Sequence, residues 1–190
     1  MIDRTTDEGP PGTEFLPSYS FHERHDSRPL CATPAEIIAA VEAIEMQDDR
    51  VTRALLAVRQ LPARLCGRDD SEGTERFGFS TFTPLRRTQR ELTLGLAGQF
   101  WRVGMQLATL HDADAFSRFV TPGNAKLVLR FLVLDRPDGL RTLRTETFVH
   151  CPDSHTRRRM TPYWWVIRLP SGWIRRRTLD AVHRMLQPGT

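Results

Sequence analysis

The most constraining feature of this sequence is a hairpin pattern in its last third. Leu127–Leu134 is nearly all apolar, which is typical of a central β-strand, and Leu140–Cys151 reads as the returning strand. Between them, Asp135–Gly139 (DRPDG) contains the aspartate, proline and glycine that favour a tight turn. Because so short a connection leaves no room for a crossover, the two strands must be antiparallel. The chain therefore builds an antiparallel sheet, and one face of such a sheet needs a cover.

Other segments of the chain show strand patterns as well. Leucines alternate with polar or small residues over Leu92–Leu96, a clear two-residue period, and we expect this strand to continue or bend past Gly98. Strands are also predicted over Phe15–His25 and over Arg76–Phe82. Pro84–Arg90 is expected to be a connection.

Helices are predicted on both sides of these strands. The segment Thr33–Glu36 (TPAE) is a capping box with proline at the first helical position, and apolar residues then recur at helical spacing as far as Ile44. A second helix is predicted over Val51–Val58 and ends before Pro62. Ala113–Phe119 is expected to be a short helix that follows an aspartate cap.

The C-terminal third of the chain is predicted to be helical, with interruptions. Asp153 can cap a helix that runs towards Ile167, and Pro162 is expected to kink or restart it. Leu169–Gly172 is predicted to be a break, and Trp173–Leu186 to be the terminal helix. Together these elements predict an α+β fold in which an antiparallel sheet packs around a C-terminal helix.

Length and composition favour a single globular domain. A chain of 190 residues with 39% hydrophobic residues can bury a sizeable core, and we expect a flexible tail over residues 1–13 and one domain over 14–187. No apolar run is long enough to predict a transmembrane helix, so integral membrane association is not expected. The N-terminus lacks the pattern of a signal peptide.

Cysteine usage and charge restrict the environment and the partners. Cys31, Cys66 and Cys151 are few, odd in number and far apart, which favours free thiols in a reducing compartment such as the cytoplasm. A net charge of +4 permits a nucleic-acid partner but does not require one, and we expect none. No phosphate-binding loop, dinucleotide fingerprint or zinc motif is present, so no cofactor is predicted.

The order of elements resembles the helix-grip fold of the START-like, or SRPBCC, superfamily, and the chain bears a closer resemblance to uncharacterised bacterial members of it. The segments that carry this likeness are LPARL (Leu61–Leu65), RELTLGLAGQFWR (Arg90–Arg102), TETFV (Thr145–Val149) and RRRMTPYWWVIRLPSGWIRR (Arg157–Arg176). The resemblance implies a curved antiparallel sheet wrapped around a C-terminal helix, with an apolar cavity between the two that holds a hydrophobic or amphipathic small molecule. Breaks at Pro162 and Pro170 would depart from the single long terminal helix of that fold.

Aromatic residues are the candidates for lining such a cavity. Phe100 and Trp101 follow two glycines, and Arg102 beside them can anchor an anionic head group. Phe131 in the central strand and Trp164 complete the predicted ligand-binding set. Ordinary core filling is the alternative role for these aromatic residues. The neighbouring Trp165 is expected at the cavity mouth or at an interface with a partner.

Two carboxylates within strands are candidates for acid–base chemistry. By strand parity, Glu91 and Glu146 lie on the face opposite the leucines, where they can pair across strands with arginines such as Arg102, Arg130 or Arg144. A bulge at Gly95 or Gly98 would instead turn a carboxylate into the cavity, where it could serve a cyclase or hydratase reaction.

The remaining charged motifs leave a third function open. His22 and His25 are three residues apart on a strand and point to opposite faces, so we expect no shared metal. The clusters Arg157–Arg159 and Arg175–Arg177 are either solvated or suited to acidic partners or anionic lipids. The sequence therefore favours small-molecule binding, with an enzyme or an interaction protein that docks acidic partners as alternatives.

Overall fold

The computed structural model describes residues 12–47, 81–102 and 106–187. These form one six-stranded sheet in the order β1-β6-β5-β3-β2, with β4 paired to the end of β3. All neighbouring strands are antiparallel. The strands are β1 (Phe21–Asp26), β2 (Thr83–Arg87), β3 (Glu91–Gln99), β4 (Gln106–Leu107), β5 (Ala125–Asp135) and β6 (Arg141–His150).

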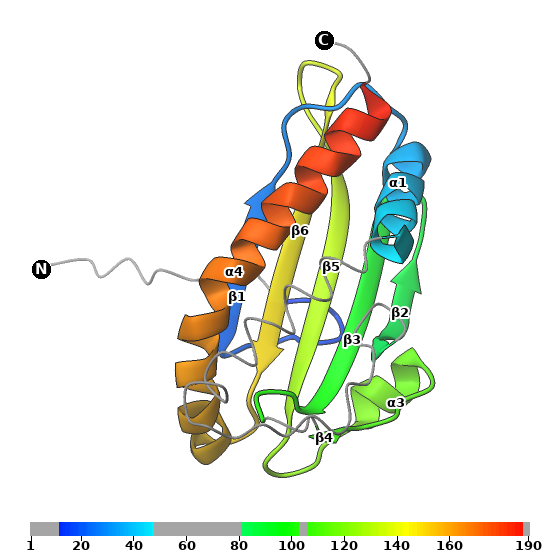
Figure 1. The fold of residues 1–190 in the computed structure, drawn as a ribbon. Helices are drawn as coiled ribbons and strands as arrows, with labels where there is room; N and C mark the ends of the chain where they lie inside the picture. Colours follow the sequence, from blue (N-terminus) through cyan, green and yellow to red (C-terminus); the bar gives the residue numbers. More distant parts are fainter. Residues whose placement is uncertain (1–11, 48–80, 103–105, 188–190) are drawn as a thin grey trace, which may run out of the picture.

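Two of the three described helices cover the same face of this sheet (Figure 1). The long helix α4 (Ser154–Leu186) crosses the sheet beside β1, and α1 (Pro34–Gln47) packs next to it. The short helix α3 (Ala113–Arg118) lies against β2 and β3. The predicted α+β architecture, an antiparallel sheet with a C-terminal helix packed on it, is therefore confirmed and is consistent with a helix-grip arrangement.

The predicted hairpin is the centre of the sheet. β5 and β6 pair without interruption from Lys126 opposite His150 to Asp135 opposite Arg141. The turn closes where Arg136 N–H donates to the Leu140 carbonyl at 2.9 Å, and Gly139 adopts a positive φ of 77° that suits glycine. The register fixes which residues of each strand face α4.

Alternation along the strands divides the core into three apolar clusters. On the α4 face, one cluster joins the sheet to α1 and the last turns of α4, and a second joins it to the first turns of α4 around Trp164. We call these the α1 cluster and the Trp164 cluster. The third cluster lies on the opposite face, where α3 and the segment 13–20 cover Ala97, Val128 and Phe148.

The first helix begins as the capping box predicts. Thr33 donates from both its backbone N–H and its hydroxyl to the Glu36 carboxylate at 2.7 Å, and Glu36 N–H donates back to the Thr33 hydroxyl at 3.3 Å. These reciprocal bonds satisfy backbone donors that the first helical turn leaves unpaired. The expected aspartate cap of α3 is also present, since Asp112 accepts from Ala115 N–H at 2.7 Å.

The predicted break in the C-terminal helix is wrong. α4 is one helix of 33 residues that contains both Pro162 and Pro170, and it continues through Leu169–Gly172. Each proline removes one backbone hydrogen bond. The helix persists because it is anchored on both sides of the prolines, by Met160 and Trp164 before Pro170 and by Leu179 and Val182 after it; all four side chains are buried.

Several strand boundaries also differ from the prediction. Thr83–Arg87, expected to be a connection, is the edge strand β2, where Pro84 is tolerated because an edge strand has one unpaired side. β1 begins only at Phe21, and Thr13 before it is buried and bridged to Leu16 rather than part of a tail. The helix predicted over Val51–Val58 and most of the strand predicted over Arg76–Phe82 lie outside the described residues.

Candidate functional site

A group of polar side chains lies between the two apolar clusters of the α4 face. We call Glu23, His25, Thr145, Thr147 and Arg175 the polar cluster. The register of β1 and β6 places Glu23 opposite Thr147 and His25 opposite Thr145. From α4, Arg175 Nη1 donates to the Thr145 hydroxyl at 2.9 Å. On β6 these threonines fall between Leu143 of the α1 cluster and Val149 of the Trp164 cluster, so the polar cluster interrupts an otherwise apolar interface.

Glu23 and His25 form a pair beneath the helix. Glu23 Oε1 and His25 Nε2 are 3.0 Å apart, and both side chains are largely buried. Directly above them is Gly172, where an added Cβ would lie 2.9 Å from Glu23 Oε1 and 3.3 Å from His25 Nε2. A glycine in the middle of α4 therefore makes room for a buried carboxylate–imidazole pair.

One member of the polar cluster has an unsatisfied hydroxyl. Thr147 is buried, and its Oγ1 has no hydrogen-bond partner among the described residues. A buried polar group without a partner costs about 1–3 kcal/mol, and a hydroxyl can donate one hydrogen bond and accept two. The polar cluster can thus accept a further polar group.

A groove of about 800 Å³ opens beside this cluster, between β1 and α4. Its floor includes the Glu23–His25 pair and Gly172. One wall is the edge strand β1 over His22–His25, and the other is formed by residues of α4: Trp165, Arg168, Leu169, Trp173 and Arg176. The groove is thus formed by the edge strand of the sheet and one flank of the C-terminal helix.

The groove is apolar and cationic at once. Trp165, Leu169 and Trp173 supply apolar surface, and Arg24, Arg168 and Arg176 supply positive charge. None of these three arginines takes part in an ion pair among the described residues. Among the described residues of the lining, Glu23 is the one acidic residue, and it contacts His25. This arrangement suits a ligand with an apolar body and an anionic group.

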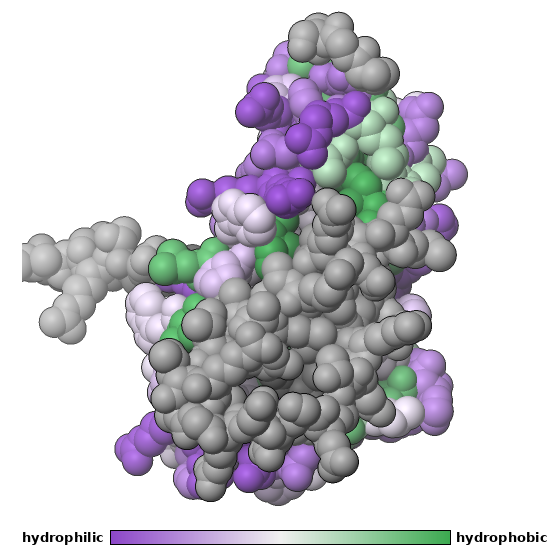
Figure 2. Space-filling view, in the orientation of Figure 1, coloured by the Kyte–Doolittle hydropathy of each residue, from purple (hydrophilic) through white to green (hydrophobic). Residues whose placement is uncertain are grey.

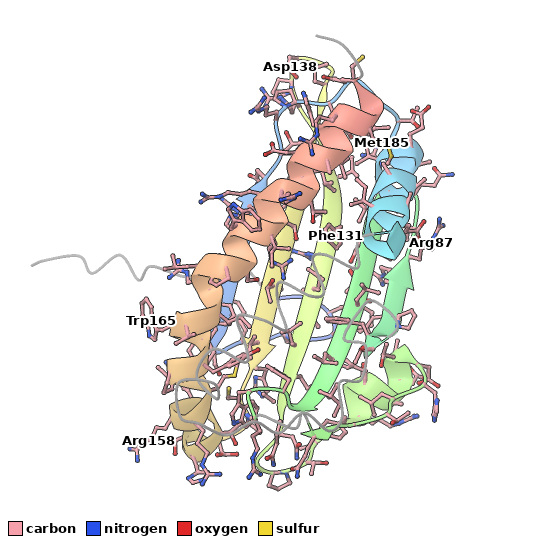
Figure 3. The ribbon with its side chains drawn as sticks, viewed as in Figure 1. Arg87, Phe131, Asp138, Arg158, Trp165 and Met185 are labelled. Atoms are coloured by element: carbon pink, nitrogen blue, oxygen red, sulfur yellow. The ribbon has the colours of Figure 1, made fainter. Side chains whose placement is uncertain are left out.

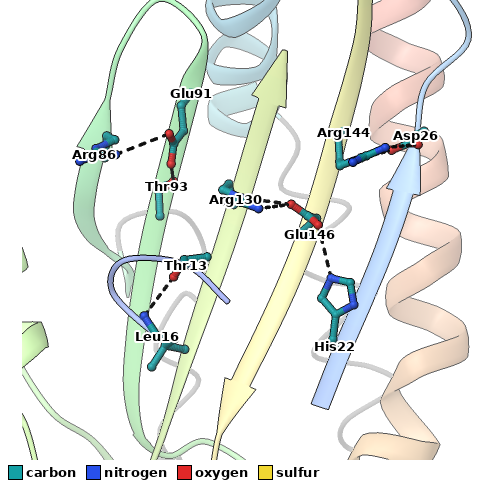
Figure 4. A network of polar contacts seen from close by, with 10 residues as sticks. All are labelled: Thr13, Leu16, His22, Asp26, Arg86, Glu91, Thr93, Arg130, Arg144 and Glu146. Atoms are coloured by element: carbon teal, nitrogen blue, oxygen red, sulfur yellow. Dashed lines mark hydrogen bonds and ion pairs between the residues drawn. The ribbon is translucent and has the colours of Figure 1, made fainter. Parts of the chain in front are cut away.

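The two predicted acid–base carboxylates lie on the other face of the sheet (Figure 4). Arg130 donates to Glu146 Oε2 from Nε at 3.1 Å and from Nη2 at 2.5 Å, and His22 Nε2 is 3.4 Å from Glu146 Oε1. Burial lowers the pKa of His22 and outweighs the attraction of Glu146, which acts in the opposite direction. Glu91 accepts from the Thr93 hydroxyl at 2.6 Å.

These positions confirm the parity prediction for Glu91 and Glu146. The alternative, in which a bulge turns a carboxylate towards the cavity, is wrong because neither strand register shifts: β3–β5 pairs from Glu91–Leu132 to Gly98–Ala125, and β5–β6 pairs from Lys126–His150 to Asp135–Arg141. Neither side chain can therefore reach the space between the sheet and α4. The arginine pairing also differs in part, since Arg102 donates to Gln99 Oε1 at 2.9 Å rather than to either acid.

The predicted ligand-binding residues are only partly brought together. Phe100 and Trp101 have ring centroids 5.6 Å apart and belong with Trp164 to the Trp164 cluster, where Trp164 stacks on Phe21 at 5.4 Å. Phe131 lies in the α1 cluster, and Arg102 is exposed. None of the five lines the groove. Trp165, which was expected at a cavity mouth or at an interface with a partner, lines the groove.

Sequence reasoning missed most of the groove. Glu23, Leu169, Gly172 and Trp173 were not predicted as site residues, because their proximity depends on α4 continuing unbroken past Pro170. One local signal was available: a glycine within an amphipathic pattern indicates close packing. His25 was considered only for a metal, and its contact with Glu23 on the α4 face confirms that it points away from His22. Within the described ranges, no group of three or more His, Cys, Asp or Glu side chains could hold a metal ion.

Comparison with known protein families, with characterised proteins and with solved structures gave no match for this chain. Among the helices of the described ranges, none has the length and hydrophobicity needed to cross a bilayer.

Proposed function

We propose that this protein binds a hydrophobic or amphipathic small molecule, with an anionic group, between the sheet and α4. The observation that carries the proposal is the groove itself, whose apolar wall of Trp165, Leu169 and Trp173 alternates with the guanidinium groups of Arg168 and Arg176. Its volume of about 800 Å³ is in the range of small-molecule sites.

The apolar body and the polar groups of such a ligand would contact different residues. The apolar body packs on the tryptophan and leucine side chains, and each buried CH₂ contributes about 0.8 kcal/mol. The anionic group lies near Arg168 and Arg176 at the rim, where charge-assisted hydrogen bonds hold it. A polar group that reaches past the Glu23–His25 pair meets the unsatisfied hydroxyl of Thr147.

The resemblance to the START-like superfamily supports the same proposal through the fold. A sheet with a long C-terminal helix is what that resemblance implies. We extend the proposal to membership in that superfamily, to a bacterial source and to a cytoplasmic location. The exposed free thiol of Cys31 supports a reducing compartment.

The first test is native mass spectrometry of protein purified from its own host. We expect a bound mass that is lost on denaturation. As a defined probe, dodecanoate should quench or shift the fluorescence of Trp165 and Trp173, and dodecanol should bind about fivefold more weakly because it lacks the charge. Protein that carries no mass and binds neither compound would refute the proposal.

Variants then locate the site. Arg168→Gln with Arg176→Gln should remove the preference for dodecanoate over dodecanol, because these guanidinium groups line the groove. Arg158→Gln, an exposed α4 arginine outside the groove, is the matched control and should leave the preference intact. Thr147→Val should stabilise the ligand-free protein by about 1 kcal/mol, because it removes an unsatisfied hydroxyl.

A further inference from the structure

The outer surface of α4 carries a strip of exposed apolar side chains. Trp165, Val166, Leu169 and Trp173 are 63%, 54%, 81% and 57% exposed. At about 100° per residue, these four lie within an arc of roughly 100° on the helix. Figure 3 shows Trp165 projecting from α4 away from the sheet. We call these four residues the α4 strip. In the described part of the chain, the other large exposed apolar residues are isolated ones, Val120 and Met185.

Positive charge surrounds the α4 strip. α4 contains eight arginines and a single acidic residue, Asp180, and every one of these arginines except Arg175 is exposed. Arg168 lies over the ring of Trp165 at 5.9 Å, and Arg177 over that of Trp173 at 5.5 Å. Figure 2 shows green apolar residues beside purple hydrophilic ones along the course of α4. None of the seven exposed arginines of α4 forms an ion pair with an acidic side chain of the described residues.

We infer that the α4 strip docks on an anionic lipid membrane, with α4 lying in the plane of the headgroups. A helix with Trp and Leu on one face and arginines beside them is suited to this position, because the apolar side chains enter the acyl boundary while the guanidinium groups stay with the phosphates. Tryptophan favours this interface. The inference goes beyond ligand binding in the groove and does not depend on it.

Other partners fit the α4 strip less well. A nucleic-acid backbone would pair with the arginines but would leave Val166 and Leu169 in water. An acidic protein needs a surface that receives its own anchor side chains, and the α4 strip is a helical ridge that projects outwards. A lipid surface satisfies both the charge and the apolar area. It also brings Trp165, Leu169 and Trp173, which line the groove, to the membrane.

The experiment is co-sedimentation of the full-length protein with vesicles. Vesicles of phosphatidylcholine mixed with phosphatidylserine should bind the protein, and vesicles of phosphatidylcholine alone should bind it far more weakly. Added salt should reduce binding, because each basic residue near an anionic surface contributes about fivefold in affinity. Upon binding, the tryptophan emission should shift to shorter wavelength.

Paired variants separate the apolar and the charged contributions. Val166→Ser with Leu169→Ser should weaken binding about tenfold or more, whereas Val120→Ser, at an exposed valine outside α4, should not change it. Arg176→Gln with Arg177→Gln should weaken binding roughly 25-fold, whereas Arg118→Gln on α3 should have little effect.

Two results would overturn the inference. The first is equal binding to neutral and anionic vesicles, or equal loss in the control variants. The second is binding to poly-glutamate without binding to vesicles, which would assign the surface to an acidic protein partner. Native mass spectrometry of a Val166→Ser single variant keeps the two proposals apart, because Val166 does not line the groove. Weakened vesicle binding with a retained ligand supports both proposals.

Discussion

The close approach of α4 to the Glu23–His25 pair makes Gly172→Ala an informative substitution. In most helix interiors, replacing glycine by alanine stabilises the helix by about 1 kcal/mol. Here the added Cβ would lie 2.9 Å from Glu23 Oε1 and 3.3 Å from His25 Nε2, closer than van der Waals contact allows. The carboxylate must therefore move, and its 3.0 Å contact with His25 is lost or strained.

The expected change in the free energy of unfolding is the sum of opposing contributions. Overpacking a well-filled site costs about 1–3 kcal/mol, and loss of a hydrogen bond to a charged group costs about 1.5–3 kcal/mol. Because Glu23 lines the groove, it can swing outwards and relieve part of the overlap, so we take the low end of both ranges. After the helical gain is subtracted, Gly172→Ala should destabilise the protein by about 1–2 kcal/mol.

The sign of the effect should reverse when the carboxylate is absent. In a Glu23→Ala background nothing blocks the new methyl group at its nearest contact, so Gly172→Ala should stabilise that variant by about 0.5–1 kcal/mol. Urea denaturation of the four proteins in this double-mutant cycle should give a coupling free energy of about 2 kcal/mol. Stabilisation of the wild-type protein by Gly172→Ala, with no coupling to Glu23, would show that the pair does not lie under the helix.

Three further predictions concern buried titratable groups. Arg130→Met should lower the free energy of unfolding by about 3 kcal/mol in urea titrations, because it leaves the buried carboxylate of Glu146 without its main partner. The pKa of His22 in the folded protein is lowered below its ordinary value of 6.5, so His22 of the unfolded chain takes up a proton at higher pH than His22 of the folded protein. The free energy of unfolding should therefore fall as the pH drops below 6.5. In His22→Phe, this part of the pH dependence should be missing. Burial raises the pKa of the Cys151 thiol to about 11, so iodoacetamide at neutral pH should label the exposed Cys31 and spare Cys151, as mapped by peptide mass spectrometry; equal labelling would contradict this placement.

Patterns of neighbouring residues in the sequence predicted the sheet and most of the described helices. The DRPDG turn and the two-residue period of β3 depend on neighbouring residues alone, and they fixed both the antiparallel pairing and the face of each side chain. That parity placed Glu91 and Glu146 correctly. The capping box at Thr33 is local in the same way, since both its hydrogen-bonding partners lie within one turn.

The features that the sequence did not predict depend on packing between residues far apart in the chain. Prolines at two positions predicted a broken C-terminal helix, but buried contacts on both sides of Pro170 keep α4 continuous. The polar cluster depends on β1 pairing with β6, elements separated by more than a hundred residues, and no local pattern reports that register. The sequence indicates only that a residue is aromatic. Solvent exposure, which distinguishes Trp165 from the buried Trp164, is a property of the folded chain.

The departures from ordinary packing in α4 coincide in one segment. From Trp165 to Arg176 the helix contains a proline, a glycine in close contact with a buried carboxylate, and four exposed apolar side chains. Each of these lowers stability, and a helix that served only to cover the sheet would carry leucine or alanine at such positions. Several destabilising features in one segment, beside a groove and an unsatisfied hydroxyl, are typical of a binding site. The same segment therefore accounts for both proposals, because Trp165, Leu169 and Trp173 line the groove and also belong to the α4 strip.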